Sequence, residues 1–413
     1  MTFKYAILMT TLNYTALFIP LFFLFLYFET LLIKRSNGKI TQTFERSLSN
    51  ISIGIAERLI NLFVAVIFYN FFYWIYSNYA LFKIPNNPFV WLLLLLATDF
   101  VWYWYHRLGH KINLFWAAHI VHHQSEEFNL TAAARITTLK AFVRYVFWGI
   151  LPLAGFHPNM VVGILIIHGV YSFFTHTETV KNLNWLEAVF ITPSLHGVHH
   201  ASNEKYLDKN YGDVFVFWDK LFGTFQKEKE KPTYGLTHSL NSYSFLWQHF
   251  HYYLEIFEAF KREKKIKGKF KILFGGPAYM DQDIRPFLEK KLRQHKVNQS
   301  SELHETFKNY LTIQIVICVT LLTYTTLLFD FLMFREKTFI VLFVLLTLIY
   351  CGALLEQRKW IYNLELARII LLLGYFSILL NQVYFFPILL LSFLVMQYLF
   401  SLKKKYHKLL LLE

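Results

Sequence analysis

Eight histidines in three short clusters are the residues of this sequence best suited to chemistry. The clusters read "HRLGH", "HIVHH" and "HGVHH", and they supply His106, His110, His119, His122, His123, His196, His199 and His200. In a helix, residues three and four positions apart share a face, so each cluster directs two or three imidazoles the same way. Neutral imidazole is the commonest metal ligand in proteins. The spacing therefore predicts a metal site.

The number of histidines indicates more than one metal ion. Catalytic zinc takes three protein ligands and structural zinc takes four, so eight histidines suffice for two metals that share one site. The sequence contains no HExxH pattern of the zinc hydrolases, and imidazole suits zinc and iron alike. Oxidation of an unactivated C–H bond in a lipid requires a redox metal, which zinc is not. Oxidative chemistry would therefore favour iron.

The composition places these histidines in a membrane protein. Of 413 residues, 55% are hydrophobic and 16% are charged, whereas soluble domains carry about 25% charged residues. Apolar runs approach the roughly 20 residues of a span. We expect an all-α, polytopic helical membrane protein with spans at Tyr14–Ile33, Ile51–Tyr76, Phe89–Tyr105, Leu139–Gly155, Met160–Phe174, Leu311–Leu332, Phe339–Leu355, Leu364–Leu380 and Tyr384–Leu402.

Other bulk features narrow the class of protein. The N-terminus lacks the pattern of a cleavable signal, so we expect a retained first span. Cys318 and Cys351 both fall in predicted spans, which makes a disulfide framework unexpected. The net charge of +14 is typical of cytoplasmic loops that face anionic lipid. Nucleic acid is not an expected partner.

Loop charge predicts four regions and an orientation. Residues 1–88 form a transmembrane anchor, 89–240 carry the clusters, 241–305 form a basic interfacial segment, and 306–413 form a second bundle. Lys34, Arg35 and the tail Lys403–Lys408 predict an external N-terminus, a cytoplasmic C-terminus and a di-metal site at the cytoplasmic membrane edge. Residues 139–174 either cross twice or form a re-entrant hairpin. Both alternatives return the chain to one side, where the three clusters can meet.

The clusters carry a family resemblance. Over roughly Phe89–Lys227, including "NYGDVFVFWDKLFGTF" (Asn210–Phe225), the chain resembles the membrane fatty acid hydroxylase/sterol desaturase superfamily of non-haem di-iron enzymes. Within that superfamily it is most similar to the alkylglycerol monooxygenases. That closer similarity rests on "THTE" (Thr175–Glu178), "YGLTH" (Tyr234–His238), "GGPAYM" (Gly275–Met280) and the C-terminal spans.

The resemblance implies a function and a ligand set. It implies two irons held by the eight histidines and by His176 as a ninth ligand, while Ser172 replaces a histidine that some relatives have. It further implies a fatty acid hydroxylase-like catalytic domain that uses dioxygen to cleave the ether bond of alkylglycerols, releasing a fatty aldehyde. Tetrahydrobiopterin would be the reductant by resemblance only. No residue set in the sequence identifies a pterin pocket or the reductase partner of related enzymes, or an oligomeric state.

Several polar residues near the clusters are candidates to hold the metal-binding histidines in position. Asp99 and Glu178 are candidates to accept the second N–H of a metal-bound imidazole. His168 is expected to pack or hydrogen-bond, and Asp213 and Asp219 to be structural loop residues. We further expect Arg107 to extend toward lipid headgroups, and His249 and His251 to be interfacial.

Two alternatives stay open at this stage. A sterol, sphingolipid, fatty acid or carotenoid hydroxylase or desaturase would use the same histidines. A histidine-rich metal transporter or metal-storage membrane protein belongs to another class. Transporters place their ligands near the bilayer midplane, whereas these clusters lie mostly at span ends, which disfavours transport. The membrane could be a bacterial inner membrane or the endoplasmic reticulum.

Overall fold

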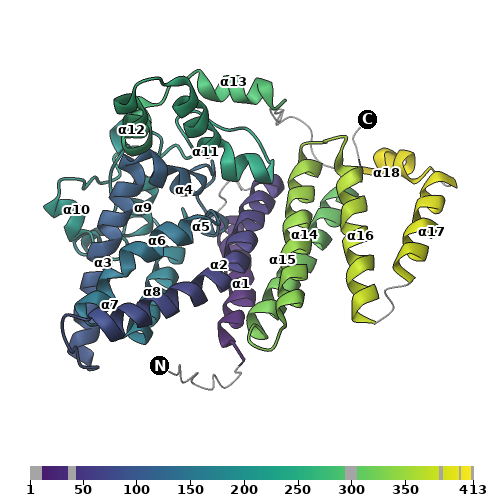
Figure 1. Ribbon diagram of the computed structural model, residues 1–413. Coiled ribbons are helices and arrows are strands. Elements are labelled where there is room, and N and C mark those ends of the chain that lie inside the picture. The colour runs from purple at the N-terminus through teal and green to yellow at the C-terminus, as the bar shows by residue number, and fades with distance from the viewer. Residues whose placement is uncertain (1–11, 36–42, 294–304, 381–384, 400, 411–413) are drawn as a thin grey trace. The chain divides into compact units, whose positions relative to one another are not determined.

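A computed structural model describes residues 12–35, 43–293, 305–380, 385–399 and 401–410. In these ranges the chain is helical, and its only β-type pairings are isolated bridges between Phe190 and Phe215 and between Ala201 and Tyr234. The all-α prediction is therefore confirmed (Figure 1). The α-helices are α1 Phe18–Arg35, α2 Phe44–Tyr79, α3 Pro88–Lys111, α4 Asn113–His123, α5 Leu130–Ala133, α6 Lys140–Trp148, α7 Ile150–Ala154, α8 Pro158–Phe174, α9 Pro193–His200, α10 Phe217–Leu221, α11 Phe245–Arg262, α12 Ile266–Phe274, α13 Ile284–Lys291, α14 Glu305–Leu327, α15 Phe334–Leu355, α16 Ile361–Leu379, α17 Phe385–Leu399 and α18 Leu402–Leu410.

The chain divides into two compact units. The histidine unit comprises Phe25–Asn241 and Trp247–His295, and the C-terminal unit comprises Met1–Leu24, Ser242–Leu246 and Lys296–Glu413. Helix α2 and most of α1, which the sequence analysis assigned to a separate anchor, belong to the histidine unit. The helices that carry the predicted ligands thus share one unit with α2.

Six described helices are long and apolar enough to cross a membrane, which supports an integral membrane protein. They coincide with α2, α3, α14, α15, α16 and the segment Tyr14–Arg35. The predicted continuous span Leu139–Gly155 is instead divided into α6 and α7, with the break at Gly149. Pro152 has no N–H to donate to the carbonyl of Trp148, so an uninterrupted helix would lose a hydrogen bond there.

The chain turns sharply between α7 and α8. Gly155 has a φ of +115°, and a Cβ atom there would lie 2.1 Å from the carbonyl oxygen of Phe82. Glycine therefore permits both the left-handed backbone and the close approach of the α2–α3 loop. The turn returns α8 against α3. The two helices then share a core that includes Leu94, Trp148 and Val161.

The helix that carries "HIVHH" is fixed at its first residue. The Asn113 side chain donates to the carbonyl of Ile272 at 2.8 Å and accepts from the Tyr252 hydroxyl at 2.6 Å. Its backbone N–H donates to the Gly275 carbonyl at 2.9 Å. The backbone bond satisfies one of the N–H groups that a helix N-terminus leaves without an intrahelical partner. Together these bonds hold α4 against α11 and α12.

The C-terminal unit contains a charged side chain between its own helices. Arg368 of α16 is 5% exposed, and its guanidinium donates to Glu365 and to Gln314, both at 2.6 Å. The cation is thereby paired within the unit, as a charge between membrane helices requires. Cys318 and Cys351 are buried free thiols in the same unit.

Candidate metal centre

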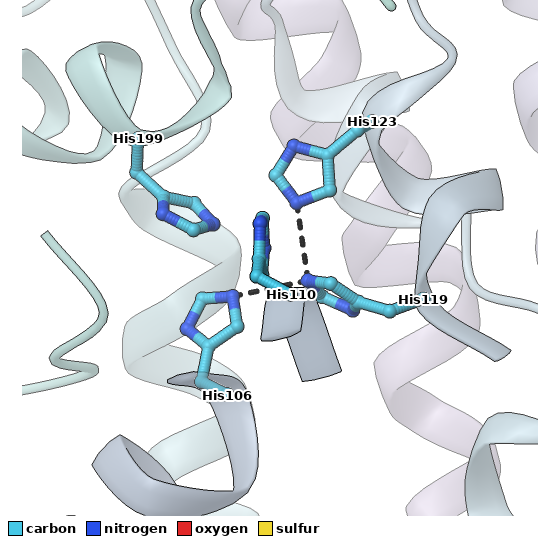
Figure 2. Close-up of side chains that lie close together, drawn as sticks. All are labelled: His106, His110, His119, His123 and His199. Atoms are coloured by element: carbon cyan, nitrogen blue, oxygen red, sulfur yellow. Dashed lines mark hydrogen bonds between the residues drawn. The ribbon is translucent and has the colours of Figure 1, made fainter. Parts of the chain in front are cut away.

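The fold gathers nine histidines into two adjoining groups. Site A contains His106, His110, His119, His123 and His199, and site B contains His122, His176, His196 and His200. In each site, one ring nitrogen from every member lies within 4.8 Å of the others. Figure 2 shows the five site A imidazoles, from three separate helices, directed toward one another. Every histidine predicted as a ligand is thus in one of the two sites.

Helical spacing explains how the clusters divide between the sites. Neighbouring helix residues differ by about 100° in direction, whereas residues four apart align. His119 and His123 therefore enter site A while His122 enters site B, and on α9 His196 and His200 enter site B while His199 enters site A. The rings of His123 and His200 stack across the two sites at 4.5 Å between centroids. The sites are therefore immediate neighbours.

The proton positions in site B favour a bound cation. The Nδ1 atoms of His122 and His176 lie 3.1 and 2.7 Å from the carbonyls of Arg135 and Ser172. Because a carbonyl only accepts, each Nδ1 carries the proton. The two Nε2 atoms are then unprotonated, yet they lie 3.2 Å apart. Two facing lone pairs repel one another, and a metal cation that binds both nitrogens would remove this repulsion.

Site A offers similar unsatisfied nitrogens. The Nδ1 atoms of His106 and His199 lie 2.9 Å from the carbonyls of Tyr211 and Lys209, which again leaves Nε2 unprotonated. The Nε2 atoms of His110 and His199 are buried and have no hydrogen-bond partner among the described residues. Buried nitrogens without a partner are costly. Both donor sets thus fit a metal that prefers imidazole, such as iron or zinc.

Burial keeps the imidazoles in the form that binds metal. It lowers the pKa of His119, His122, His123, His196 and His200 well below the ordinary value. It lowers the pKa of His176 to about 3 and that of His199 to about 4. For His119 and His122, the charge of buried Lys140 is the next cause. At neutral pH these histidines are therefore uncharged.

The loop 208–215 orients two ligands of site A. It supplies both carbonyls that accept from His106 and His199. Asp219 holds the loop, because its carboxylate accepts from the N–H groups of Tyr211 and Gly212 at 2.7 and 2.8 Å. A Cβ atom on Gly212 would lie 2.6 Å from the Phe215 carbonyl oxygen. Asp219 was expected to be a structural loop residue, but it lies in α10 and supports from there the loop that reaches the metal ligands.

Asp99 supports the same loop from α3 and does not reach an imidazole of either site. Its carboxylate accepts from Val214 N–H at 2.9 Å, Phe215 N–H at 3.1 Å and Trp218 Nε1–H at 3.0 Å. His168 hydrogen-bonds Asp213 at 2.6 Å, in agreement with its expected role. Asp99, His168 and Asp213 form a third compact group. Both Asp99 oxygens, Asp213 Oδ2 and His168 Nδ1 have hydrogen-bond partners, which makes the group a support for the loop, while His168 Nε2 is buried and has no hydrogen-bond partner among the described residues.

Arg135 is a supporting residue that sequence reasoning missed. It is 4% exposed, its carbonyl accepts from His122, and its guanidinium donates to the carbonyl of Val121 at 2.7 Å and to Gln248 at 2.6 Å. Burial lowers its pKa to about 9. The arginine thus joins α4 to α11 beside site B. No spacing rule relates Arg135 to His122, so only the fold reveals it.

Other expected residues lie elsewhere. Glu178 is exposed and interacts with Tyr234, while the Nδ1–H of His176 is satisfied by the Ser172 carbonyl. The interfacial placement of His249 and His251 is wrong, because both are at most 2% exposed. His251 lies 3.4 Å from Gln124. Arg107 donates to the Tyr103 hydroxyl at 2.9 Å and lies over the Trp104 ring.

Comparison with known proteins agrees with the geometry. The fatty acid hydroxylase family profile matches residues 91–224, the segment that holds every member of both sites. The alkylglycerol monooxygenase of Homo sapiens is 34% identical over 86% of this chain and 80% of its own length. The Danio rerio enzyme of that name is 32% identical over 79% and 74%. The Xenopus tropicalis enzyme is 35% identical over 56% and 52%.

No solved structure matches the chain significantly. The likeness to the human protein nevertheless covers most of both chains and includes the segment in which both sites lie. The chain therefore belongs to the alkylglycerol monooxygenase family, and it is an oxygen-dependent lipid monooxygenase of the membrane.

Proposed function

We propose that this protein is a di-iron monooxygenase that cleaves the ether bond of alkylglycerols. Site A and site B would each hold one iron, through five and four imidazoles. The unprotonated nitrogens of His122 and His176, which face each other at 3.2 Å, carry the metal-binding part of this proposal, because a cation that binds both would remove the repulsion between their lone pairs. The resemblance of the whole chain to alkylglycerol monooxygenases supports the substrate.

The reaction balances with dioxygen and two electrons. Iron would supply the oxidising power that inserts one oxygen atom into the C–H bond beside the ether oxygen. The second oxygen atom leaves as water, with two protons and two electrons from an external reductant. The hemiacetal formed on the substrate then breaks its bond to the glycerol oxygen, giving a fatty aldehyde and a glycerol. We propose a tetrahydropterin as the reductant, by family likeness alone.

The protein's own residues have two tasks in this scheme. The carbonyls of Arg135, Ser172, Lys209 and Tyr211 fix the Nδ1 protons and so direct the Nε2 lone pairs inward. Burial keeps the imidazoles neutral and water-poor, which favours metal binding and protects a reactive oxidant. The apolar helices α2, α3 and α8 belong to the same unit and would give an alkyl chain bilayer-like surroundings.

One assay tests the proposed function. Purified protein in detergent, loaded with ferrous iron, receives a 1-O-alkylglycerol, dioxygen and a tetrahydropterin, and fatty aldehyde is measured by mass spectrometry. We expect aldehyde that requires both oxygen and pterin. A sample that holds two irons per chain and yields no aldehyde would refute the ether substrate. Sterols and fatty acids would then be the substrates to test.

A matched pair of histidine variants links the activity to the sites. H122A removes a site B ligand, and we expect a loss larger than the roughly 10–100-fold that removal of a ligand's hydrogen-bond partner costs. H157N is the control, because His157 caps α8 through a bond from Asn159 N–H at 3.2 Å, and asparagine can keep that cap. Equal aldehyde yields from H122A and the wild type would contradict the assignment of site B.

A further inference from the structure

Helix α12 exposes an apolar stripe that no described residue covers. Ile266, Phe270 and Phe274 are spaced by four and are 75%, 61% and 55% exposed. Residues four apart lie on one helix face, so the three side chains form one continuous stripe. The rings of Phe270 and Phe274 stack with their centroids 6.0 Å apart. Other faces of α12 are partly buried, because Ile272 and Leu273 pack against the core that contains Ile120 and Val121 of α4.

Positive charge borders this stripe. The segment "KREKKIKGKFK", residues 261–271, contains seven Lys or Arg residues and one acidic residue, Glu263. None of its lysines forms an ion pair in the described structure. Lys269 and Lys271 lie over the rings of Phe260 and Tyr279. An exposed apolar face bordered by lysines is typical of a helix that lies in the headgroup layer of an anionic membrane.

The position of α12 within the histidine unit, next to a candidate membrane span, also favours contact with a membrane surface. Helix α3 is a candidate membrane span that ends at Lys111. Asn113, two residues further on, donates its N–H to the carbonyl of Gly275, which follows α12 directly, at 2.9 Å. The C-terminal end of α12 therefore lies beside the C-terminal end of the candidate span α3. A span and an interfacial helix that meet in this way share one bilayer boundary.

From these observations we infer that α12 binds the surface of an anionic phospholipid bilayer. Ile266, Phe270 and Phe274 enter the headgroup region, and the neighbouring lysines bind lipid phosphates. Since α12 also holds the first residue of α4, the lipid contact anchors the helix that carries His119, His122 and His123. This inference does not depend on the reaction that the histidines perform.

Site-directed labelling in nanodiscs tests the contact. The full chain carrying F270C is labelled with an environment-sensitive fluorophore, and Q282C, an exposed polar position beyond α12, is the matched control. Both are placed in phosphatidylcholine, or in phosphatidylcholine with one third phosphatidylglycerol, each with and without brominated acyl chains. The labelled wild type gives the background from Cys318 and Cys351. A metal content equal to that of the wild type shows that each variant folds.

Quenching of F270C by brominated lipid, stronger with phosphatidylglycerol and absent from Q282C, is the expected result. Replacing Lys267 and Lys271 by Gln should reduce the effect of phosphatidylglycerol while leaving quenching in the neutral lipid. F270C quenching no greater than that of Q282C in both lipids would overturn the inference. Equal quenching in neutral and anionic lipid would overturn its electrostatic part. Disulfide-linked dimers of F270C in place of quenching would identify a second copy as the occupant.

Discussion

Asp219 holds the loop that orients two ligands of site A. Its two carboxylate oxygens accept from Tyr211 N–H, Gly212 N–H and the Thr224 hydroxyl at 2.7 to 2.8 Å. The loop held in this way presents carbonyls to His106 and His199. The Asp219 carboxylate does not touch the imidazoles. Through the loop that it holds, it thus helps to determine which nitrogen of His106 and of His199 is free to bind a metal.

D219N is expected to weaken metal binding at site A. Asparagine is similar in shape, but its NH₂ group would face an N–H donor where the carboxylate accepted a hydrogen bond. We expect metal affinity at site A to fall by roughly 10–100-fold, measured by titration against a chelating competitor. E178Q is the control, because Glu178 is exposed and does not contact the ligands. An unchanged affinity in D219N would show that the loop does not position His106 and His199.

The stability of the metal-free protein should depend on the buried histidines. The pKa of His176 falls from 6.5 to about 3 and that of His199 from 6.5 to about 4 on folding. Between these values the unfolded chain binds more protons than the folded one, so stability is complete above pH 6.5 and decreases as the pH falls toward 4 and 3. Chemical unfolding of the metal-free protein across this range measures the effect. Constant stability between pH 7 and 4 would contradict it.

At the scale of elements, α9 shows how a short helix is made rigid enough to supply three ligands. It has only eight residues, and it begins with Pro193 and with a cap from Thr192, whose hydroxyl accepts from Leu195 N–H at 3.4 Å. The same hydroxyl donates to Glu187 at 3.1 Å. Short helices are marginal on their own. The cap and the packing of Leu195 and Val198 therefore hold the imidazoles in place.

T192V is expected to destabilise α9 without changing its shape. Loss of an N-cap hydroxyl costs about 1 kcal/mol, and we expect lower unfolding stability together with reduced metal content at both sites, because α9 contributes to both. T192S should restore both properties, since serine keeps the cap. The measurements are unfolding in denaturant and metal per chain. If T192V and T192S have the same metal content, the cap does not determine the geometry of the sites.

At the scale of the whole molecule, the two sites link metal binding to folding. Nine imidazoles from α3, α4, α9 and the segment after α8 converge only in the folded histidine unit. A ligand that binds only the folded state adds about 2.7 kcal/mol of stability at 100 times its dissociation constant. Chelation should therefore lower the thermal unfolding midpoint, and added ferrous iron should restore it. H122A, which lacks a site B ligand, should show a smaller shift. A midpoint that chelation leaves unchanged would mean that the histidines hold no metal.

The orientation of the chain is a prediction at the same scale. The basic tail Lys403–Lys408 and the first loop, with Lys34 and Arg35, predict that the C-terminus and the histidine sites are cytoplasmic. A reporter that fluoresces only in the cytoplasm, fused after Glu413, should fluoresce, whereas the same reporter before Met1 should not. The opposite pattern would place the sites on the outer side of the membrane.

The local spacing of the histidines was enough to predict that they bind metal. An i, i+3, i+4 pattern of histidines fixes which imidazoles share a helix face, because helical geometry is the same in every fold. His106, His119, His123 and their partners could therefore be predicted as one constellation. The long apolar runs that form α2, α3 and α14 to α16 were equally clear. Their length and hydrophobicity depend on the chain alone.

The tertiary structure decided what surrounds the imidazoles. Sequence spacing could not pair His106 with the carbonyl of Tyr211, 105 residues later, or His122 with that of Arg135, since a backbone carbonyl is present at every position. Folding likewise placed the Asp99 carboxylate against the backbone of Val214 and Phe215 in the loop 208–215, and it left Glu178 exposed. The residue types and their periodicity thus determined which atoms could bind metal. Long-range packing, which no local pattern encodes, decided which helices meet around each site and which nitrogens are free to bind.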